Sequence, residues 1–457
     1  MPYKRFISSS LLLLSLSSCA LYHPQHDAQQ AIDKQLVPAN WAQNQAIPAS
    51  ADSDWLQQFN DPLMLALIKE GQANNTDLRL AAANMDKAWL LAKQAGARLK
   101  PTVDLSLART QSGSADGGSS TQAINVGVTA SWELDLWGRI QAGVDAASSS
   151  AQASTADYLF AKHSLSNNIA KTYLKIIEAK QQAQLAQNNL KISQKNLRIT
   201  LLKLELGSAS EQDAALNKAN VALAKDQLLN LNASTREALR AIEVLLGRYP
   251  SSSIEIANVL PTLPNNPPAG IPSSVLERRP DIIAAERRVA SAFNANAQAK
   301  AAQLPSFSLT GTLSGASPSL SDILSPANVA WQLGANLLSP LFDAGKRRID
   351  VEISTLEQQQ ALDDYAGSAL NAFAEVEHNL DQAQLLSQRE AVLAEALKQS
   401  QKAYHIAQLR YQEGESSLLD TLSFQQQAIS AESNLLFIKR AQLEQRLNFY
   451  LALGGNW

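Results

Sequence analysis

Residues 124–139 have the sequence INVGVTASWELDLWGR, and this stretch decides the fold of the chain. Apolar residues stand at every second position from Ile124 to Leu136, and most residues between them are small or polar. This period of two predicts a β-strand with one apolar face. After Gly138 the chain is rich in Ala, Leu, Gln, Lys and Glu up to residue 206, which predicts a helix. At about 1.5 Å per residue that helix spans about 100 Å, more than the thickness of a globular domain.

The same arrangement occurs again 207 residues later. Three glycines of the first half recur in the second half with one constant offset, and their neighbours match as well. The pairs are Gly138 with Gly345, Gly207 with Gly414, and Gly247 with Gly454. Single glycines often match by chance, but three in register with similar flanking residues do not. We therefore infer an internal tandem duplication.

Each copy is expected to contain a helix that ends before a proline, a pair of strands, a long helix and a return helix. In the first copy (61–250) these lie at about 62–98, within 99–136, at 139–206 and at 210–247. In the second copy (276–457) they lie at about 281–302, within 304–342, at 346–413 and at 417–453. A Pro-rich linker at 251–275 joins the copies and interrupts any continuous helix.

Composition excludes several classes of protein. The 457 residues carry a net charge of −3, which gives no basic field for nucleic acid. One cysteine excludes a disulfide scaffold, and no apolar run after residue 16 approaches the roughly 18 residues of a membrane helix. No metalloprotease, nucleophile-elbow or dinucleotide motif is present, so we expect no enzyme and no cofactor. The pair His23 and His26 is a weak metal candidate, and we expect no metal site.

The N-terminus has the pattern of a bacterial lipoprotein signal. Two basic residues precede an apolar run that is too short to cross a bilayer, and the run ends in Leu16-Ser17-Ser18-Cys19. This resembles a lipobox, in which the cysteine is acylated and becomes the new N-terminus. We therefore expect a signal peptide at 1–18, a lipid on Cys19 and an extended tether within 19–60. The alternative is an ordinary secretory signal with an incidental cysteine.

Four strands with one apolar face suit the wall of a membrane barrel, but four strands cannot close one. The smallest membrane barrels have about eight strands, and an open edge in lipid leaves backbone groups unpaired. Two, three or four chains would give eight, twelve or sixteen strands. One alternative is a soluble four-stranded sheet covered by helices, and another is a coiled-coil rod, but neither explains both the strands and the helices of about 100 Å.

Several motifs carry a resemblance to a known family. They are Trp55-Leu56-Gln57-Gln58-Phe59 with Asp61-Pro62, Trp132-Glu133-Leu134-Asp135-Leu136-Trp137-Gly138-Arg139, Leu276-Glu277-Arg278-Arg279-Pro280-Asp281-Ile282, Pro340-Leu341-Phe342-Asp343-Ala344-Gly345, and Arg410-Tyr411 with Gly414. With these motifs, residues 16–457 resemble the TolC-like outer-membrane factors, specifically their NodT-type lipoprotein branch.

The resemblance implies an α+β membrane protein that works as a homotrimer. Three chains, with four strands each, would form a twelve-stranded outer-membrane β-barrel that continues as a long periplasmic α-helical barrel. The terminal segments and the linker would form an equatorial collar. Such channels are exit ducts of tripartite efflux systems, with a periplasmic adaptor and an inner-membrane transporter of the RND or a similar type. We expect export of small molecules such as drugs; the alternatives are type I secretion and a structural coiled-coil lipoprotein that is not a channel.

The resemblance also implies a gate where the helical hairpins turn, at Gly207 and Gly414. In this family a Tyr three residues before the glycine, apolar residues and carboxylates after it close the periplasmic tip. The candidate gate residues are Asp213, Arg410, Tyr411, Leu419 and Asp420. In a trimer each Asp becomes a ring of three carboxylates that attracts cations, and a Leu ring excludes water. The alternative for the two aspartates is favourable charge at a helix N-terminus.

Overall fold

The computed structural model describes residues 37–38, 40–42, 55–113, 115–116, 120–266 and 272–455. Within them, one compact unit comprises residues 83–156 and 284–367, and a second unit comprises the others. Each unit takes residues from both sequence repeats, and helices α4 (Arg139–Glu205) and α8 (Lys346–Glu413) run through both. The predicted signal peptide, Cys19 and most of the predicted tether lie outside the described residues. None of the helices in the described ranges is long and apolar enough to cross a membrane.

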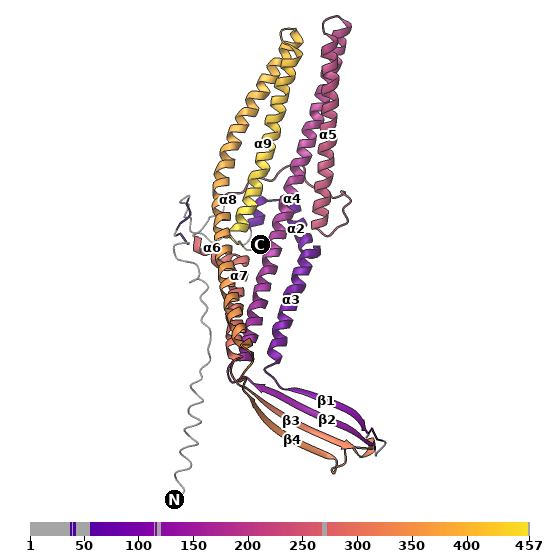
Figure 1. Cartoon of the computed structure of the whole chain (residues 1–457). Helices are drawn as coiled ribbons and strands as arrows, with labels where there is room; N and C mark the ends of the chain where they lie inside the picture. Colours follow the sequence, from indigo (N-terminus) through magenta and orange to yellow (C-terminus); the bar gives the residue numbers. More distant parts are fainter. Residues whose placement is uncertain are drawn as a thin grey trace. The chain divides into compact units, whose positions relative to one another are not determined.

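The first unit contains a four-stranded antiparallel sheet in the order β1-β2-β3-β4 (Figure 1). The strands are β1 (Thr102–Ser112), β2 (Thr121–Leu134), β3 (Ser306–Ser317) and β4 (Val329–Leu338), with the short helix η4 (Leu320–Asp322) before β4. Strands β2 and β3 pair from Ile124 opposite Ser317 to Leu134 opposite Phe307, so one sheet joins both repeats. Strands β1 and β4 form the two edges, and almost all of their residues are exposed.

The helices of the first unit follow the same order as the strands. Helix α3 (Thr76–Ala97) contacts α4 through Trp89, whose Nε1 donates to Thr155 Oγ1 at 3.1 Å. Helix α4 contacts α7 (Pro280–Ala301), where Ser291 donates to the Ala146 carbonyl at 2.9 Å. Helix α7 contacts α8 through Asn296, which donates to Ser354 and to Thr355 at 2.9 and 3.0 Å. The helical layer therefore reads α3-α4-α7-α8, with α3 and α8 at its edges.

The motif at residues 132–139 connects the sheet to helix α4. Glu133 pairs with Arg139 through two contacts of 2.8 and 2.9 Å. The Asp135 carboxylate accepts the backbone N–H groups of Ile140 and Gln141 at 2.9 and 2.7 Å, so it caps the first turn of α4. Trp137 donates to the Pro305 carbonyl at 2.6 Å, next to β3. The polar groups of this motif therefore each make a hydrogen bond that holds the strand-to-helix turn in place.

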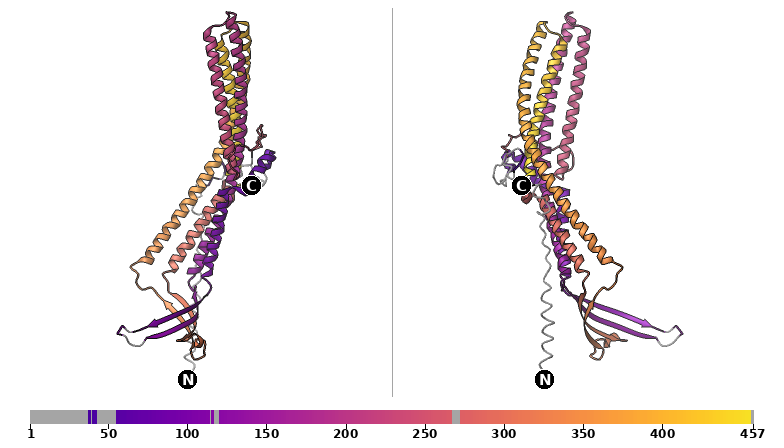
Figure 2. Two further views of the ribbon diagram at one scale, coloured as in Figure 1. Left: turned by 90° about the vertical axis from the view of Figure 1, so that its right-hand side faces the viewer. Right: turned by 60° about the vertical axis from the view of Figure 1, so that its left-hand side comes forward.

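The second unit contains most of the apolar core. It includes η3 (Trp55–Phe59), α2 (Pro62–Asn74), α5 (Glu211–Leu245), α6 (Pro272–Arg278) and α9 (Leu418–Ala452), together with the remaining parts of α4 and α8. Figure 2 shows α4 beside α5 and α8 beside α9 as two helical hairpins. The largest fully buried side chains here include Phe59, Met64, Ile169, Tyr173, Leu174, Ile176, Ile177, Ile242, Leu246 and Phe449.

The structure differs from the expectation of one helix over about 62–98. Residue Asn75, with φ −62° and ψ 131°, separates α2 from α3. Its side chain accepts the Leu78 N–H at 2.9 Å and donates to the Leu245 carbonyl at 3.0 Å. Asn75 therefore caps α3 and ties the break to the end of α5. The local composition favours a continuous helix, and a contact across 170 residues overrides it.

The internal duplication also appears in the backbone. All six glycines that pair between the repeats adopt positive φ, between 68° and 85°. Gly138 and Gly345 stand directly before α4 and α8, and the other four stand one or two residues after a helix, where a residue without a Cβ avoids strain. The two return helices begin alike as well, with a serine N-cap and an acidic residue three positions later, Ser210 with Asp213 and Ser417 with Asp420.

Candidate functional site

The two hairpin turns have one geometry. After α4, Gly207 has φ +70°, and the Ser208 N–H donates to the Lys203 carbonyl at 2.7 Å. After α8, Gly414 has φ +85°, and the Glu415 N–H donates to the Arg410 carbonyl at 2.8 Å. This is the Schellman ending, in which a left-handed glycine lets the last carbonyls find donors. Both glycines therefore end their helices as predicted from the sequence.

The candidate gate residues Asp213 and Asp420 hydrogen-bond to the serine N-caps of their return helices in this structure. Asp213 Oδ2 accepts from the backbone N–H of Ser210 at 3.0 Å and from its hydroxyl at 2.8 Å. The Ser417 hydroxyl donates to Asp420 Oδ2 at 2.7 Å. In each of these two Ser–Asp pairs the backbone N–H of the aspartate donates to the serine hydroxyl oxygen at 3.1 Å. One carboxylate oxygen of each pair therefore stabilises the start of a return helix, and a role in the gate stays a prediction.

Tyr411 ties the second hairpin to the first. Its hydroxyl lies 3.2 Å from Thr200 Oγ1, and its carbonyl accepts from Lys203 Nζ at 2.9 Å. The same ammonium lies 4.2 Å from the centre of the Tyr411 ring, a cation–π contact. Thr200 is fully buried and also accepts from Asn217 of α5 at 2.8 Å. The structure thus brings Tyr411 together with three polar residues that the sequence did not single out.

The other two candidate gate residues are exposed. Arg410 lies in the last turn of α8, one residue before Tyr411. Leu419, at the start of α9, has 66% of its surface exposed. The five candidates therefore do not form one cluster within a single chain, since Tyr411 alone among them hydrogen-bonds to the neighbouring hairpin. A ring around a threefold axis remains the prediction for the exposed ones.

A groove of about 820 Å³ runs between α5 and α9, with α4 as its floor. Its apolar side chains near the tips are Leu216, Leu223, Leu419, Leu422 and Ile429. On α9 these recur at spacings of three and seven, and on α5 at seven, the pattern of a helix that offers one face to another helix. Further from the turns the lining becomes polar. The groove has the form that accepts an amphipathic helix.

Hydrogen bonds connect α4 to α9 along much of their length. We call this set the polar seam. It comprises Asn167 and Lys171 with Asn448, Glu178 with Arg440, Gln182 with the Ser433 carbonyl, and Asn189 and Asn196 with Gln425. A hydrogen bond of this kind contributes only about 1 kcal/mol net to the association of the two helices. The reason is that water can hydrogen-bond to both groups when the helices separate. The polar seam is therefore easier to separate than the apolar core beside it.

The motif around Arg279 anchors three helices. The guanidinium is 4% exposed, donates to both Asp281 oxygens at 3.0 and 2.7 Å, and reaches Glu375 of α8 at 2.6 Å. It also donates to the Ala452 carbonyl at the end of α9 at 3.1 Å. Burial alone would lower the pKa of Arg279, but the two carboxylates raise it above its ordinary value. Arg279 is therefore the centre of a junction of α7, α8 and α9.

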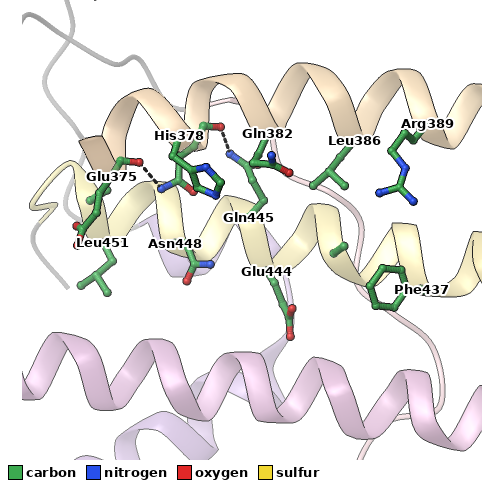
Figure 3. Close-up of a pocket in the computed structure, with 13 residues that line it drawn as sticks. Glu375, His378, Gln382, Leu386, Arg389, Phe437, Glu444, Gln445, Asn448 and Leu451 are labelled. Atoms are coloured by element: carbon green, nitrogen blue, oxygen red, sulfur yellow. Dashed lines mark hydrogen bonds between the residues drawn. The ribbon is translucent and has the colours of Figure 1, made fainter. Parts of the chain in front are cut away.

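Beside this junction lies a second groove of about 530 Å³, between α8 and α9 (Figure 3). The Gln445 amide donates to the Asn379 carbonyl at 2.7 Å, and the Asn379 amide donates to the Glu375 carbonyl at 2.7 Å. Figure 3 shows His378 and Arg389 on α8 facing the α9 side chains. The lining carries both signs of charge, so it offers no preference for one class of ion. Among the described residues, no group of three His, Cys, Asp or Glu side chains is arranged to hold a metal ion.

The linker after α5 is held by a buried carboxylate. Glu243 is 1% exposed and accepts the N–H groups of Ser252, Ser253 and Ile254 at 2.6, 2.8 and 3.2 Å. Burial alone would raise the pKa of Glu243, but these hydrogen bonds lower it below its usual range. Lys180 of α4 donates to the Ile256 carbonyl at 2.6 Å and so also holds the linker.

We expect Glu243→Gln to change how stability depends on pH. A carboxylate with a lowered folded pKa stabilises the protein above its unfolded pKa of about 4.3, and this contribution is lost as pH falls through the folded value. The variant should therefore melt below wild type at pH 7, and the gap should narrow below about pH 4. Melting in detergent at several pH values measures it, with the exposed Glu237→Gln as control. A gap of equal size at both ends of the range would contradict the assignment.

Comparisons with known proteins agree with this architecture. A family model described as outer membrane efflux protein matches residues 67–248 and again residues 271–455, one match for each repeat. The pyoverdine export outer membrane protein OpmQ of Pseudomonas aeruginosa is 30% identical over 97% of this chain and 96% of its own. The antibiotic efflux pump outer membrane protein ArpC of Pseudomonas putida is 29% identical over 99% of this chain and 96% of its own.

A solved structure has the same fold over nearly the whole length. The MtrE outer membrane channel of Neisseria gonorrhoeae, in its open state, superposes with a TM-score of 0.84 and 28% identity. The superposition covers 96% of this chain and 98% of that one.

Proposed function

The chain belongs to the outer membrane efflux protein family, and from this premise we propose that it is the exit duct for small organic molecules, closed at its helical tips by the candidate gate residues. As a member of that family it is an outer-membrane channel that works as a trimer with a periplasmic adaptor and an inner-membrane pump. The predicted fold class, outer-membrane location and exit-channel function are confirmed. Members of the family are channels rather than enzymes.

The class of cargo rests on the named relatives. OpmQ exports pyoverdine and ArpC belongs to an antibiotic efflux pump, so both serve small organic molecules. The cation efflux protein CusC is also similar, at 27% identity over 97% of this chain. This chain has only three Met and one Cys, which offers few of the soft ligands that a dedicated route for soft metals would use. Small organic cargo is therefore favoured over metal ions and over secreted proteins.

The groove between α5 and α9 is the proposed seat of the adaptor. Its apolar stretch, which includes Leu223 and Leu419, lies toward the turns and offers a surface for the apolar face of an amphipathic helix. An adaptor helix in this groove would contact α5 of one hairpin and α9 of the other. Such binding would favour opening if the adaptor helix binds more tightly when the two hairpins are apart. An inner-membrane transporter of the RND type is the proposed energy source.

The proposed lipid on Cys19 supplements the barrel as a membrane anchor. Each buried acyl CH₂ contributes about 0.8 kcal/mol, so more than one acyl chain holds the N-terminus firmly at the membrane. The support is the lipobox pattern of Leu16 to Cys19 in the sequence.

The gate is tested by single-channel conductance in planar bilayers. Asp213→Ala with Asp420→Ala removes the two carboxylates that hydrogen-bond to the serine N-caps and should raise conductance on the order of threefold. The matched pair Asp213→Asn with Asp420→Asn keeps a capping oxygen but removes the charge, so it should lower cation selectivity with a smaller gain in conductance. Glu211→Ala with Glu415→Ala makes the same change in charge at exposed positions and serves as control.

The outcomes separate the gate from the duct. Unchanged conductance and selectivity in both aspartate pairs would refute the gate assignment while the channel stands. A wild-type trimer that inserts but conducts no ions, even when an adaptor is added, would refute the duct itself.

A further inference from the structure

A notch of about 480 Å³ interrupts the apolar face of the sheet. On this face the register arranges the side chains in rows that cross the strands. In one row Ala130 lies opposite Gly311, and Gly311 lies opposite Leu333. The next row toward the helices contains Trp132 opposite Leu309. The notch lies over the two small residues, and the large side chains of the neighbouring row form one of its walls.

A third row forms the wall on the side away from the helices. It contains Val128 opposite Leu313 and Leu313 opposite Trp331. The two large rows are four residues apart along a strand, which is about 13 Å. A Cβ added at Gly311 would lie 3.2 Å from Leu333 Cδ2, so a side chain at this position would fill the notch. Because alternate residues of a strand point to opposite faces, the side chains that enter the notch are all apolar.

The notch lies near the end of the sheet that adjoins the helices. Trp132 stands two residues before the end of β2 at Leu134, and its Nε1 donates to the Leu99 carbonyl at 3.0 Å. Tryptophan is enriched where a membrane protein crosses the interface between lipid and water. In an outer-membrane channel of this family the long helices lie on the periplasmic side. The notch therefore faces the periplasmic leaflet, just inside its interface.

Two cations stand at the periplasmic end of the notch. Leu99, whose carbonyl binds the tryptophan, lies between Arg98 and Lys100, and both of these side chains are exposed. The next residue, Pro101, lines the notch itself. Residues 87–103 contain four basic residues and no acidic one, so the local charge is positive. The site thus combines an apolar recess in the leaflet with positive charge at the height of the phospholipid headgroups.

We propose that the notch binds one acyl chain of an anionic phospholipid of the periplasmic leaflet, and that Arg98 and Lys100 hold its phosphate. The acyl chain covers the row of small residues, which neither large row can cover. The guanidinium and the ammonium donate charge-assisted hydrogen bonds to the phosphate oxygens. A zwitterionic phospholipid offers the same acyl chains but carries its own amine, so the two cations favour the anionic headgroup. This lipid site is separate from the path of the exported molecule.

Native mass spectrometry of the purified full-length trimer in detergent tests the site. The probes are palmitoyl-oleoyl phosphatidylglycerol and the phosphatidylethanolamine with the same two chains. One phosphatidylglycerol per chain should bind, about tenfold more tightly than phosphatidylethanolamine. Gly311→Leu fills the notch and should weaken the binding of both lipids at least tenfold. Gln111→Leu is the matched control, because it adds the same side chain at an exposed position on the same face of β1, and it should bind both lipids as wild type does.

A second pair of variants tests the headgroup contact without altering the sheet. Arg98→Ala with Lys100→Ala should bind the two lipids equally, because the notch remains and the preference for phosphatidylglycerol is lost. Lys87→Ala with Lys93→Ala removes the same charge from exposed positions further along α3 and should keep the preference. Since both pairs lie outside the strands, they also decide the question if Gly311→Leu does not assemble.

Three outcomes would overturn the proposal. The first is a wild-type trimer that binds neither lipid. The second is phosphatidylglycerol bound as tightly by Gly311→Leu as by wild type, which would place the lipid elsewhere on the sheet. The third is a preference for phosphatidylglycerol that survives in Arg98→Ala with Lys100→Ala. None of these outcomes changes the conductance expected of the channel, so the duct stands or falls separately.

Discussion

Arg279→Ala should unfold the junction of α7, α8 and α9 and cost about 3 kcal/mol, close to the lower limit for losing one partner of a buried ion pair. The side chain is 4% exposed and makes four hydrogen bonds, to Asp281, Glu375 and the Ala452 carbonyl. Glu375 is more than half exposed, so water solvates its carboxylate when Arg279 is removed. We therefore expect a loss of stability near the lower limit. Melting in detergent and the amount of trimer in the outer membrane measure the effect.

The neighbouring arginine is the matched control. Arg278 has the same side chain but lies exposed, so Arg278→Ala should shift stability by less than about 0.5 kcal/mol. Arg279→Lys keeps the charge but loses the bidentate contact to Asp281, and it should fall between the two. Equal melting of the two alanine variants would show that the junction does not depend on the buried guanidinium.

Lys203→Ala with Tyr411→Ala should produce the largest gain in conductance. The pair supplies the hydrogen bond from Lys203 to the Tyr411 carbonyl, the cation–π contact and the bond from Tyr411 to Thr200. Together these are worth about 2 kcal/mol, so their loss shifts the equilibrium between joined and separated hairpins about 30-fold. Single-channel recording and entry of bulky antibiotics into cells report the change.

Two further variants identify which contact matters. Tyr411→Phe removes only the hydroxyl and keeps the ring beneath Lys203, so it should have a smaller effect. Lys195→Ala, at an exposed position of the same helix, should have none. A closed channel in the double variant would show that the hairpins are held by contacts other than Tyr411.

Local patterns predicted much of the fold. The paired glycines mark the starts and ends of helices, because the backbone at these turns needs a positive φ. The strands follow from a period of two, and β2 ends at Leu134, within the predicted range of 99–136. In these cases the residue pattern and the structure that it predicts lie within a few positions of each other in the sequence.

Contacts between distant residues could not be predicted in this way. The break at Asn75 depends on Leu245, and the position of Tyr411 depends on Thr200, 211 residues away. The groove between α5 and α9 is formed by two helices that are far apart in the sequence, so no local pattern predicts it. The spacing of seven residues between Leu216 and Leu223 on α5 was the available signal that this helix offers an apolar face. Lys203 could also have been noticed from the sequence, because it is a basic residue in the last turn of its helix.

The duplication has a consequence for symmetry. Three chains with two hairpins each place six quasi-equivalent hairpins around one axis, and an undiverged ancestor would have made them identical. The repeat offset of 207 pairs Lys203 with Arg410 and Leu204 with Tyr411, so the two hairpins of a chain differ where they meet. The sixfold pattern is thereby reduced to threefold, with alternating boundaries within and between chains. Two kinds of boundary can differ in strength, which six identical hairpins would not allow, and the proposed gate makes use of this difference.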